Sequence, residues 1–226
     1  MSSAPSDPVR ERFRAKARAF DRLYDDRAWL QRRLRPALHL RTELALGLIE
    51  RFDEPRVLDV GCGSARLGER ALERGVREYV GVDFSDAMIR LARERLERFG
   101  SRARLVEGDF LTVPLDAAFD VVLALGFFDY VADPRPYARR MRELCSGSAA
   151  ASFPKWSWHK GPVRKVRYEL IGDVPIFDYT RESVEVLFRG AGFDTVEATP
   201  MTRSGLYAEA RVSTHSTHDP TPGSSA

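Results

Sequence analysis

Apolar residues recur at helical spacing through the first fifty residues of the chain. One apolar stripe is formed by Phe13, Ala17, Phe20 and Tyr24. A second periodic stretch covers about 29–52, and spacings of three and four residues place such side chains on one face of a helix. Asp53-Glu54-Pro55 ends the pattern, because the residue before a proline disfavours helix. The pattern therefore predicts a helical cap over residues 1–52.

Beyond residue 55 the pattern changes to short apolar runs separated by amphipathic stretches. The apolar runs predict strands at 56–60, 78–82, 103–106, 119–125 and 148–153. The stretches between them predict helices at 64–74, 86–99 and 133–144. Strands that alternate with helices form a parallel sheet with helices on both of its faces.

The C-terminal part follows a different pattern. A capped helix at 180–190 precedes two apolar runs, at 193–199 and 206–212, that only a short turn region separates. Such a pair of strands forms an antiparallel hairpin at a sheet edge. Residues 213–226 contain Ser, Thr, His, Pro and Gly without an apolar anchor, so we expect a disordered tail. The core domain is therefore predicted to span residues 53–212.

Composition narrows the class of protein. The chain has 226 residues, of which 43% are hydrophobic and 31% charged, as in one soluble α/β domain. No apolar run reaches about eighteen residues, so we expect no membrane-spanning helix. Residues 1–18 are rich in arginine and lack the apolar core of a secretion signal. Cys62 and Cys145 form neither a disulfide framework nor a metal motif, so we expect a cytoplasmic protein without a bound metal.

Glycines and carboxylates gather where the predicted strands end. Gly61 and Gly63 follow the first strand, Asp83 ends the second, and Asp109 follows the third. The carboxyl ends of parallel strands meet at one edge of an open sheet, and ligands bind there. A glycine loop lets backbone approach a ligand, and a carboxylate after the second strand can accept both hydroxyls of a ribose. Because two glycines alone are also typical of a tight turn, the prediction of a nucleoside site rests on the whole set.

Four stretches of the sequence carry a resemblance to a known family. They are Val57-Leu58-Asp59-Val60-Gly61-Cys62-Gly63-Ser64-Ala65, Val82-Asp83-Phe84-Ser85-Asp86-Ala87-Met88, Glu107-Gly108-Asp109-Phe110 and Phe119-Asp120-Val121-Val122. As an ordered set they resemble the motifs of class I S-adenosylmethionine-dependent methyltransferases. The resemblance implies an α/β fold with a Rossmann-like, seven-stranded, mostly parallel sheet of order 3-2-1-4-5-7-6. It also implies S-adenosyl-L-methionine as the cofactor and S-adenosyl-L-homocysteine as the product.

The resemblance gives roles to the residues of the first two motifs. The loop Gly61-Cys62-Gly63-Ser64 would pack on the methionine moiety and the ribose of the cofactor. Asp83 would hold the ribose hydroxyls, with Phe84 against the adenine, whereas Asp59 would order the loop. Ala65 stands where many members of the family carry a third glycine, and we expect a small alanine to be tolerated there in the first turn of a helix.

Further cofactor contacts are implied for four other residues. Asp109 would meet the adenine amino group, with Phe110 beside the ring. The backbone around Leu125 would lie near the methionine part. Arg41 resembles an arginine that some members of the family direct at the cofactor carboxylate.

The sequence says less about the methyl acceptor. The fourth strand is followed by Gly126-Phe127-Phe128-Asp129-Tyr130, which is not the Asn/Asp-Pro-Pro-aromatic signature of enzymes that methylate base amino groups. A general base is needed only if the acceptor holds its proton at neutral pH. Asp129, Tyr130 and His159 are candidates for it, against the alternative roles of turn, packing and surface residue. The catalytic residues are therefore left open.

Basic and aromatic residues mark a possible acceptor region. Between residues 139 and 168 eight basic residues accompany one acidic residue, and we expect contacts to the substrate from Tyr24, Lys155, Trp156 and Arg164. Such a segment favours a small, anionic acceptor that is methylated at oxygen or nitrogen, although a solvated charged face is the alternative.

Other functions remain as alternatives. The chain could be an RNA or protein methyltransferase, or a non-catalytic cofactor-binding protein of the same fold. Arg66 occupies the place of the last glycine in a dinucleotide fingerprint, which argues against a nicotinamide-dependent oxidoreductase. The oligomeric state is not predicted.

Overall fold

The computed structural model describes residues 36–116, 118–154, 177–202 and 205–213. The predicted stripe of Phe13, Ala17, Phe20 and Tyr24 lies outside the described residues, as does the tail from residue 214 onward. The boundaries of the predicted helical cap therefore stay a prediction. No helix within the described ranges is long and apolar enough to cross a membrane.

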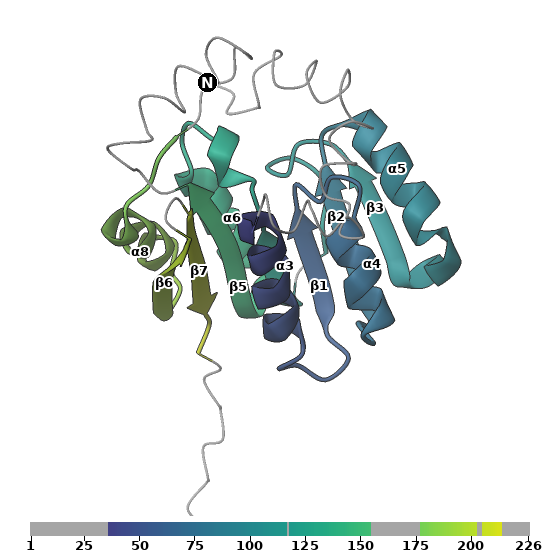
Figure 1. The fold of residues 1–226 in the computed structure, drawn as a ribbon, viewed down its shortest axis with the longest axis horizontal. Coiled ribbons are helices and arrows are strands. Elements are labelled where there is room, and N and C mark those ends of the chain that lie inside the picture. Colours follow the sequence, from purple (N-terminus) through teal and green to yellow (C-terminus); the bar gives the residue numbers. More distant parts are fainter. Residues whose placement is uncertain (1–35, 117, 155–176, 203–204, 214–226) are drawn as a thin grey trace, which may run out of the picture.

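One seven-stranded sheet forms the centre of the molecule (Figure 1). Its strands are β1 (Arg56–Val60), β2 (Glu78–Asp83), β3 (Ala103–Glu107), β4 (Phe119–Ala124), β5 (Cys145–Pro154), β6 (Thr195–Thr202) and β7 (Gly205–Arg211). Their order is β3-β2-β1-β4-β5-β7-β6, with β1 to β5 parallel and β7 antiparallel to both of its neighbours. The predicted sheet order and the C-terminal hairpin are confirmed.

Helices cover both faces of the sheet, as predicted (Figure 1). One face packs against α3 (Pro36–Ile49), α4 (Arg66–Glu73) and α5 (Asp86–Leu96), and the other packs against α6 (Arg135–Leu144) and α8 (Arg181–Gly190). Two short 3-10 helices, η1 (Glu97–Arg102) and η2 (Phe128–Tyr130), complete the described helical elements. Since successive strand residues face opposite sides, the apolar run of β1 divides between two cores: Val57 joins the α3–α4 side and Leu58 joins the α6–α8 side.

Several element boundaries differ from the predicted ones. Strand β5 begins at Cys145, three residues before the predicted start, because Ser146 and Gly147 form an irregular pairing with β4. The Ser146 hydroxyl donates to the carbonyl oxygen of Phe119 at 3.0 Å, which keeps this part in the sheet. Because this bulge consists of a polar residue and a glycine, the pattern of apolar residues gives no sign of it.

The topology brings the carboxyl ends of the parallel strands to one edge, the upper edge of the sheet in Figure 1. The registers align these ends: Val60 of β1 pairs with Val82, and Asp83 of β2 pairs with Glu107 of β3. The loops that follow β1 to β4 therefore lie beside one another. Most of the predicted cofactor residues are on these loops, whereas Asp59 lies within β1 and Asp83 is the last residue of β2.

Candidate functional site

The loop after β1 has a backbone that favours glycine. Gly61 and Gly63 have φ values of 71° and 55°. The amides of Gly61 and Cys62 both donate to the carbonyl oxygen of Val82, at 2.8 and 3.1 Å, which ties the loop to β2. A Cβ atom placed on Gly61 would lie 2.8 Å from Cδ2 of Phe127, so a side chain does not fit there. The tight packing of Phe127 over this loop requires glycine at 61.

The Cys62 side chain belongs to the sheet side of the loop. A Cβ atom on Gly81 of β2 would lie 2.8 Å from the Cys62 sulfur, so the thiol packs where β2 has no side chain. Burial raises the pKa of the thiol well above its usual value, and the Asp83 and Asp59 carboxylates raise it further. The thiol therefore stays neutral at physiological pH.

Asp83 fixes the relative position of two loops. Its Oδ2 accepts from the amide of Gly63 at 2.9 Å, and its Oδ1 accepts from the amide of Ser85 at 2.9 Å. A carboxylate has about four acceptor sites, so two bonds leave capacity for a ligand hydroxyl. Burial raises the pKa of Asp83 to about 6, although the two amides oppose this shift.

Ala65 has a different conformation from the one expected. Its φ of 55° and ψ of 37° are left-handed, and the helix α4 begins only at the next residue. The expectation that Ala65 lies in the first turn of a helix is therefore wrong. Left-handed backbone costs a residue with a Cβ about 1–2 kcal/mol. The methyl group is fully buried in the core, and this packing offsets part of the cost.

Asp59 lies under the glycine loop. Its side chain is 4% exposed, and its Oδ2 accepts from the hydroxyl of Tyr79 at 2.8 Å. Burial raises the pKa of Asp59 to about 6; the Tyr79 bond lowers it, the Asp83 charge raises it, and Arg41 lowers it. Asp59 thus links β1 to β2, and its role in ordering the loop stays a prediction.

The loop after β3 brings Asp109 to the same edge. Gly108 donates its amide to the carbonyl oxygen of Asp83 at 3.0 Å, and Asp109 Oδ1 accepts from the amide of Leu111 at 3.0 Å. The Phe110 ring is 3% exposed and stacks on Tyr137 of α6, with centroids 6.5 Å apart. The structure therefore puts Asp109 at the partly exposed edge and Phe110 in the core. The predicted contact of Phe110 with an adenine ring stays a prediction.

Arg41 reaches the loop after β4 from helix α3. Gly126 has a φ of 71°, and a Cβ atom on it would lie 2.9 Å from Nη2 of Arg41. The amide of Gly126 donates to Oγ of Ser152 at 2.8 Å. Arg41 and the partly exposed Leu125 thus lie at the same edge, and their contacts with the cofactor stay a prediction.

Of the three candidates for a general base, the structure describes two, Asp129 and Tyr130. Asp129 and Tyr130 form part of η2 next to this edge, and both are half-buried. The backbone carbonyl of Asp129 accepts from the amide of Phe177 at 3.2 Å, which fits a turn residue without testing a role as base. His159 lies outside the described residues.

The predicted acceptor region is described only in part. Tyr24, Lys155, Trp156 and Arg164 lie outside the described residues. Two arginines of the basic segment serve the fold instead. Arg142 donates through Nε to the carbonyl oxygen of Gly192 at 2.8 Å, and Arg140 donates to two loop carbonyls. Within the described residues, no group of three or more histidine, cysteine, aspartate or glutamate side chains is placed to bind a metal ion.

Sequence reasoning missed several residues that shape this edge. Phe127 covers Gly61, whereas Arg95 and Arg140 bind carbonyl oxygens of the loops after β1 and β3. The aromatic pair after β4 was a visible signal for Phe127. The arginines gave none, because the chain has many arginines and only the folded helices show which of them face a loop.

Comparison with known proteins relates the chain to methyltransferases. Residues 57–147 match a family model described as a methyltransferase domain. The demethylmenaquinone methyltransferase of Thermus thermophilus is 35% identical over 147 residues, which cover 58% of this chain and 66% of the relative. The ubiquinone biosynthesis O-methyltransferase of Idiomarina loihiensis is 33% identical over 104 residues, covering 43% of this chain and 42% of the relative. The chain thus spans less than two thirds of the length of these curated relatives.

The fold is also that of a solved methyltransferase. The structure of magnesium protoporphyrin IX methyltransferase from Synechocystis PCC 6803, with bound S-adenosylhomocysteine, superposes with a TM-score of 0.73 at 19% sequence identity. The superposition covers 91% of this chain and 98% of that chain. At this identity the likeness concerns the fold.

Proposed function

This chain belongs to the class I S-adenosylmethionine-dependent methyltransferases, and on this premise we propose that it transfers a methyl group from S-adenosylmethionine to a small organic acceptor. The observation that carries the proposal is the position of Asp83. Its carboxylate ends β2, joins the glycine loop to the start of α5, and keeps acceptor capacity at the ligand-binding edge of the sheet.

The residues of the edge fit this cofactor. Gly63 offers open backbone, since apart from its two chain neighbours no atom of the described residues lies within 4 Å of a Cβ placed on it. We assign the ribose hydroxyls to Asp83, the adenine amino group to Asp109 and the carboxylate to Arg41. Arg41 brings a positive charge to the loop after β4, where a carboxylate can pair with it.

Positioning is the main task left to the protein. When bound, S-adenosylmethionine supplies a methyl group that its sulfonium already activates for displacement. The loops after β1 and β4 then hold the donor in place, and closing the edge to water favours an in-line approach of the acceptor. Asp129 and Tyr130 serve as a base only if the acceptor holds its proton.

For the acceptor we propose a small molecule with a carboxylate or phosphate, methylated at oxygen or nitrogen. The basic residues of the segment 139–168 other than Arg140 and Arg142, which bind backbone carbonyls, support the negative charge. The names of the two curated relatives support a small organic acceptor, since one names demethylmenaquinone and the other ubiquinone biosynthesis. The cytoplasmic location predicted from the cysteine content is part of the same proposal.

Calorimetry tests the cofactor half of the proposal. We expect S-adenosylmethionine and S-adenosylhomocysteine to bind and NAD not to bind. Asp83→Ala should weaken binding severely, because the ribose hydroxyls lose their acceptor. Asp120→Ala is the matched control, since Asp120 accepts the amide of Arg56 at 2.8 Å at the opposite edge of the sheet. Binding of NAD alone, or equal effects of the two substitutions, would contradict the assignment.

A labelled-methyl assay tests the acceptor. Extract fractions treated with nuclease or protease should keep their acceptor activity, whereas removal of small molecules should abolish it. Loss of the signal on nuclease or protease treatment would instead identify an RNA or protein methyltransferase. Joint replacement of Lys155, Lys160, Arg164 and Arg167 should weaken binding of the acceptor and leave cofactor binding unchanged; unchanged acceptor affinity would refute the anionic acceptor.

A further inference from the structure

The loop after β3 is held from behind by one side chain of α6. Arg140 donates through Nη1 to the carbonyl oxygen of Leu111 at 2.9 Å and through Nη2 to that of Val113 at 2.5 Å. Its guanidinium also lies 5.5 Å from the centroid of the Phe110 ring. These contacts fix the backbone of residues 110–113, which directly follow Asp109.

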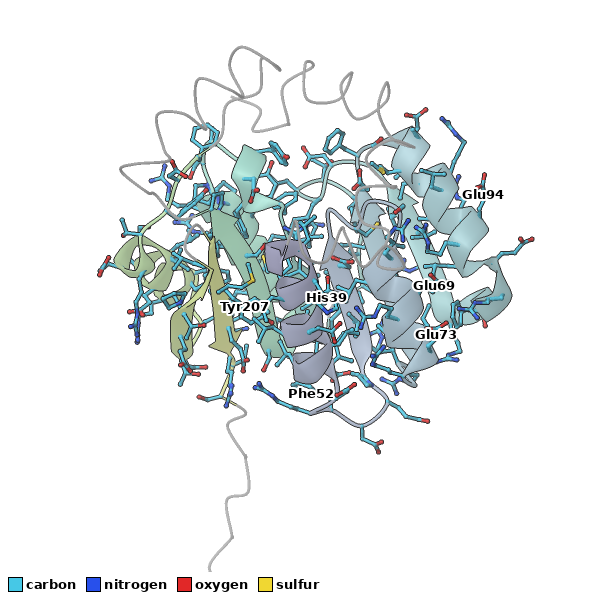
Figure 2. The ribbon with its side chains drawn as sticks, viewed as in Figure 1. His39, Phe52, Glu69, Glu73, Glu94 and Tyr207 are labelled. Atoms are coloured by element: carbon cyan, nitrogen blue, oxygen red, sulfur yellow. The ribbon has the colours of Figure 1, made fainter. Side chains whose placement is uncertain are left out.

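The glycine loop is held in a similar way from α5. Arg95 donates through Nη1 to the carbonyl oxygen of Ser64, and its Nε lies 3.5 Å from Oε2 of Glu69 on α4. The Arg95 side chain is only 16% exposed. Glu69 lies one turn before Glu73 along α4 (Figure 2). One guanidinium thus joins the loop to both of the helices next to it.

We propose that Arg95 and Arg140 are positioning residues, which hold the loops after β1 and β3 in the conformation that binds the cofactor. This inference rests on the proposed function. Neither side chain is assigned a contact with the cofactor. Each acts through a loop: Arg95 through Ser64, next to Gly63, and Arg140 through the turn that presents Asp109.

The physical reason is preorganisation. A guanidinium offers several donors in a fixed planar fork, and a charged donor binds a carbonyl more strongly than a neutral one does. Without these bonds the loop would have to be ordered when the ligand binds, and that entropy would reduce the affinity. Loss of either guanidinium should therefore weaken cofactor binding by about tenfold, the effect of ordering about one more residue.

The chain offers a matched control for each arginine. Arg102 makes the same kind of bonds as Arg140, from Nη2 to the carbonyl oxygens of Leu72 at 3.0 Å and Val76 at 2.6 Å, but at the opposite edge of the sheet. Arg98 pairs with Glu69 at 3.1 Å and with Glu73, in the same group of charges as Arg95. Both controls remove an arginine without releasing a loop of the cofactor edge.

The test compares four variants of the full chain, Arg140→Met, Arg102→Met, Arg95→Met and Arg98→Met. Calorimetry measures the dissociation constant of S-adenosylhomocysteine, and thermal unfolding measures the loss of stability. We expect Arg140→Met and Arg95→Met to bind about tenfold more weakly, with a less favourable binding entropy. The two controls should lose comparable stability or less and keep the affinity of the unsubstituted protein.

Two further measurements separate positioning from general loss of structure. Arg140→Lys keeps one charged donor and should recover part of the affinity; it also replaces Arg140→Met if that variant does not fold. Hydrogen exchange of the amides of residues 111–113 should accelerate in Arg140→Met and not in Arg102→Met. Equal affinity changes in a variant and its control, or no change in either, overturn the inference. Failure of the unsubstituted chain to bind S-adenosylhomocysteine overturns the proposed function itself.

Discussion

At the scale of the residue, two features of Asp83 have opposite effects on its pKa. Two backbone amides stabilise its ionised form, whereas its burial favours the neutral acid, and burial dominates because the pKa is raised to about 6. The ionised form has more acceptor capacity for ribose hydroxyls than the protonated form has. Ionisation of this one carboxyl group should therefore control cofactor affinity near neutral pH.

We predict that the affinity for S-adenosylhomocysteine rises as the pH increases from 5 to 7 and then levels off. Below about pH 6 the free protein holds a proton on Asp83, and binding has to release it. Asp83→Asn should bind about tenfold to a hundredfold more weakly at pH 7.5, the effect of losing bonds to a charged group. Calorimetry over this pH range measures both effects. The variant controls for titration of Asp59 and of the ligand, so an equal pH dependence in both proteins would contradict the prediction.

At the scale of the element, helix α4 begins in an unusual way. The residue before it, Ala65, has left-handed backbone and donates its amide to the carbonyl oxygen of Cys62 at 3.0 Å. The glycine loop therefore continues through Ala65, and the helix starts at Arg66. The loop thus includes Ala65 in addition to the two glycines. Position 65 favours glycine, because a left-handed backbone brings a Cβ atom too close to the neighbouring backbone.

We predict that Ala65→Gly changes the free energy of unfolding by less than about 1 kcal/mol, since relief of left-handed strain offsets the lost burial of a methyl group. Ala71→Gly is the matched control, because Ala71 is also fully buried but lies inside α4. There glycine should cost about 1–2 kcal/mol, from helix propensity and lost burial together. Denaturant unfolding measures both values. Equal destabilisation by the two substitutions would show that the strain at Ala65 is absent in solution.

At the scale of the whole molecule, two buried carboxyl groups lie near the ligand-binding edge of the sheet, Asp59 in β1 and Asp83 at the end of β2. Asp59 and Asp83 both have a pKa raised to about 6, first by burial, and the Asp83 charge adds to the shift of Asp59. A group with a raised pKa binds its proton more tightly in the folded state than in the unfolded chain. The contribution of these carboxyls to stability therefore falls as the pH rises from about 4 to about 6.

We predict that Asp59→Asn gains stability relative to the unsubstituted protein as the pH rises through this window. The gain should reach about 3 kcal/mol at neutral pH, from a shift of about two pKa units. The asparagine carbonyl can still accept from the Tyr79 hydroxyl. Denaturant unfolding of both proteins at pH 4, 5, 6 and 7 measures the difference, in which the carboxyls that do not interact with Asp59 cancel. A difference that is constant with pH would refute the raised pKa of Asp59.

The sequence by itself determined the class of fold, because apolar runs, helix caps and glycine loops are local features that specify short segments. The order of the strands and the donor half of the reaction came from the resemblance of its ordered motifs to a known family. The ordered motifs around Gly61, Asp83 and Asp109 then sufficed to name the cofactor. The bulge at Ser146 and Gly147 was missed because it carries no apolar signal.

Only the tertiary structure decided which side chains serve the edge and which serve the core. Phe110 and Asp109 are neighbours in sequence, yet one ring is buried on Tyr137 while the other side chain stays at the edge. Arg140 belongs to a basic segment that suggested an anionic acceptor, but it is bound to the carbonyl oxygens of Leu111 and Val113. Such contacts join residues about thirty positions apart, and they depend on how a helix packs against a loop. No local pattern in the sequence encodes that packing.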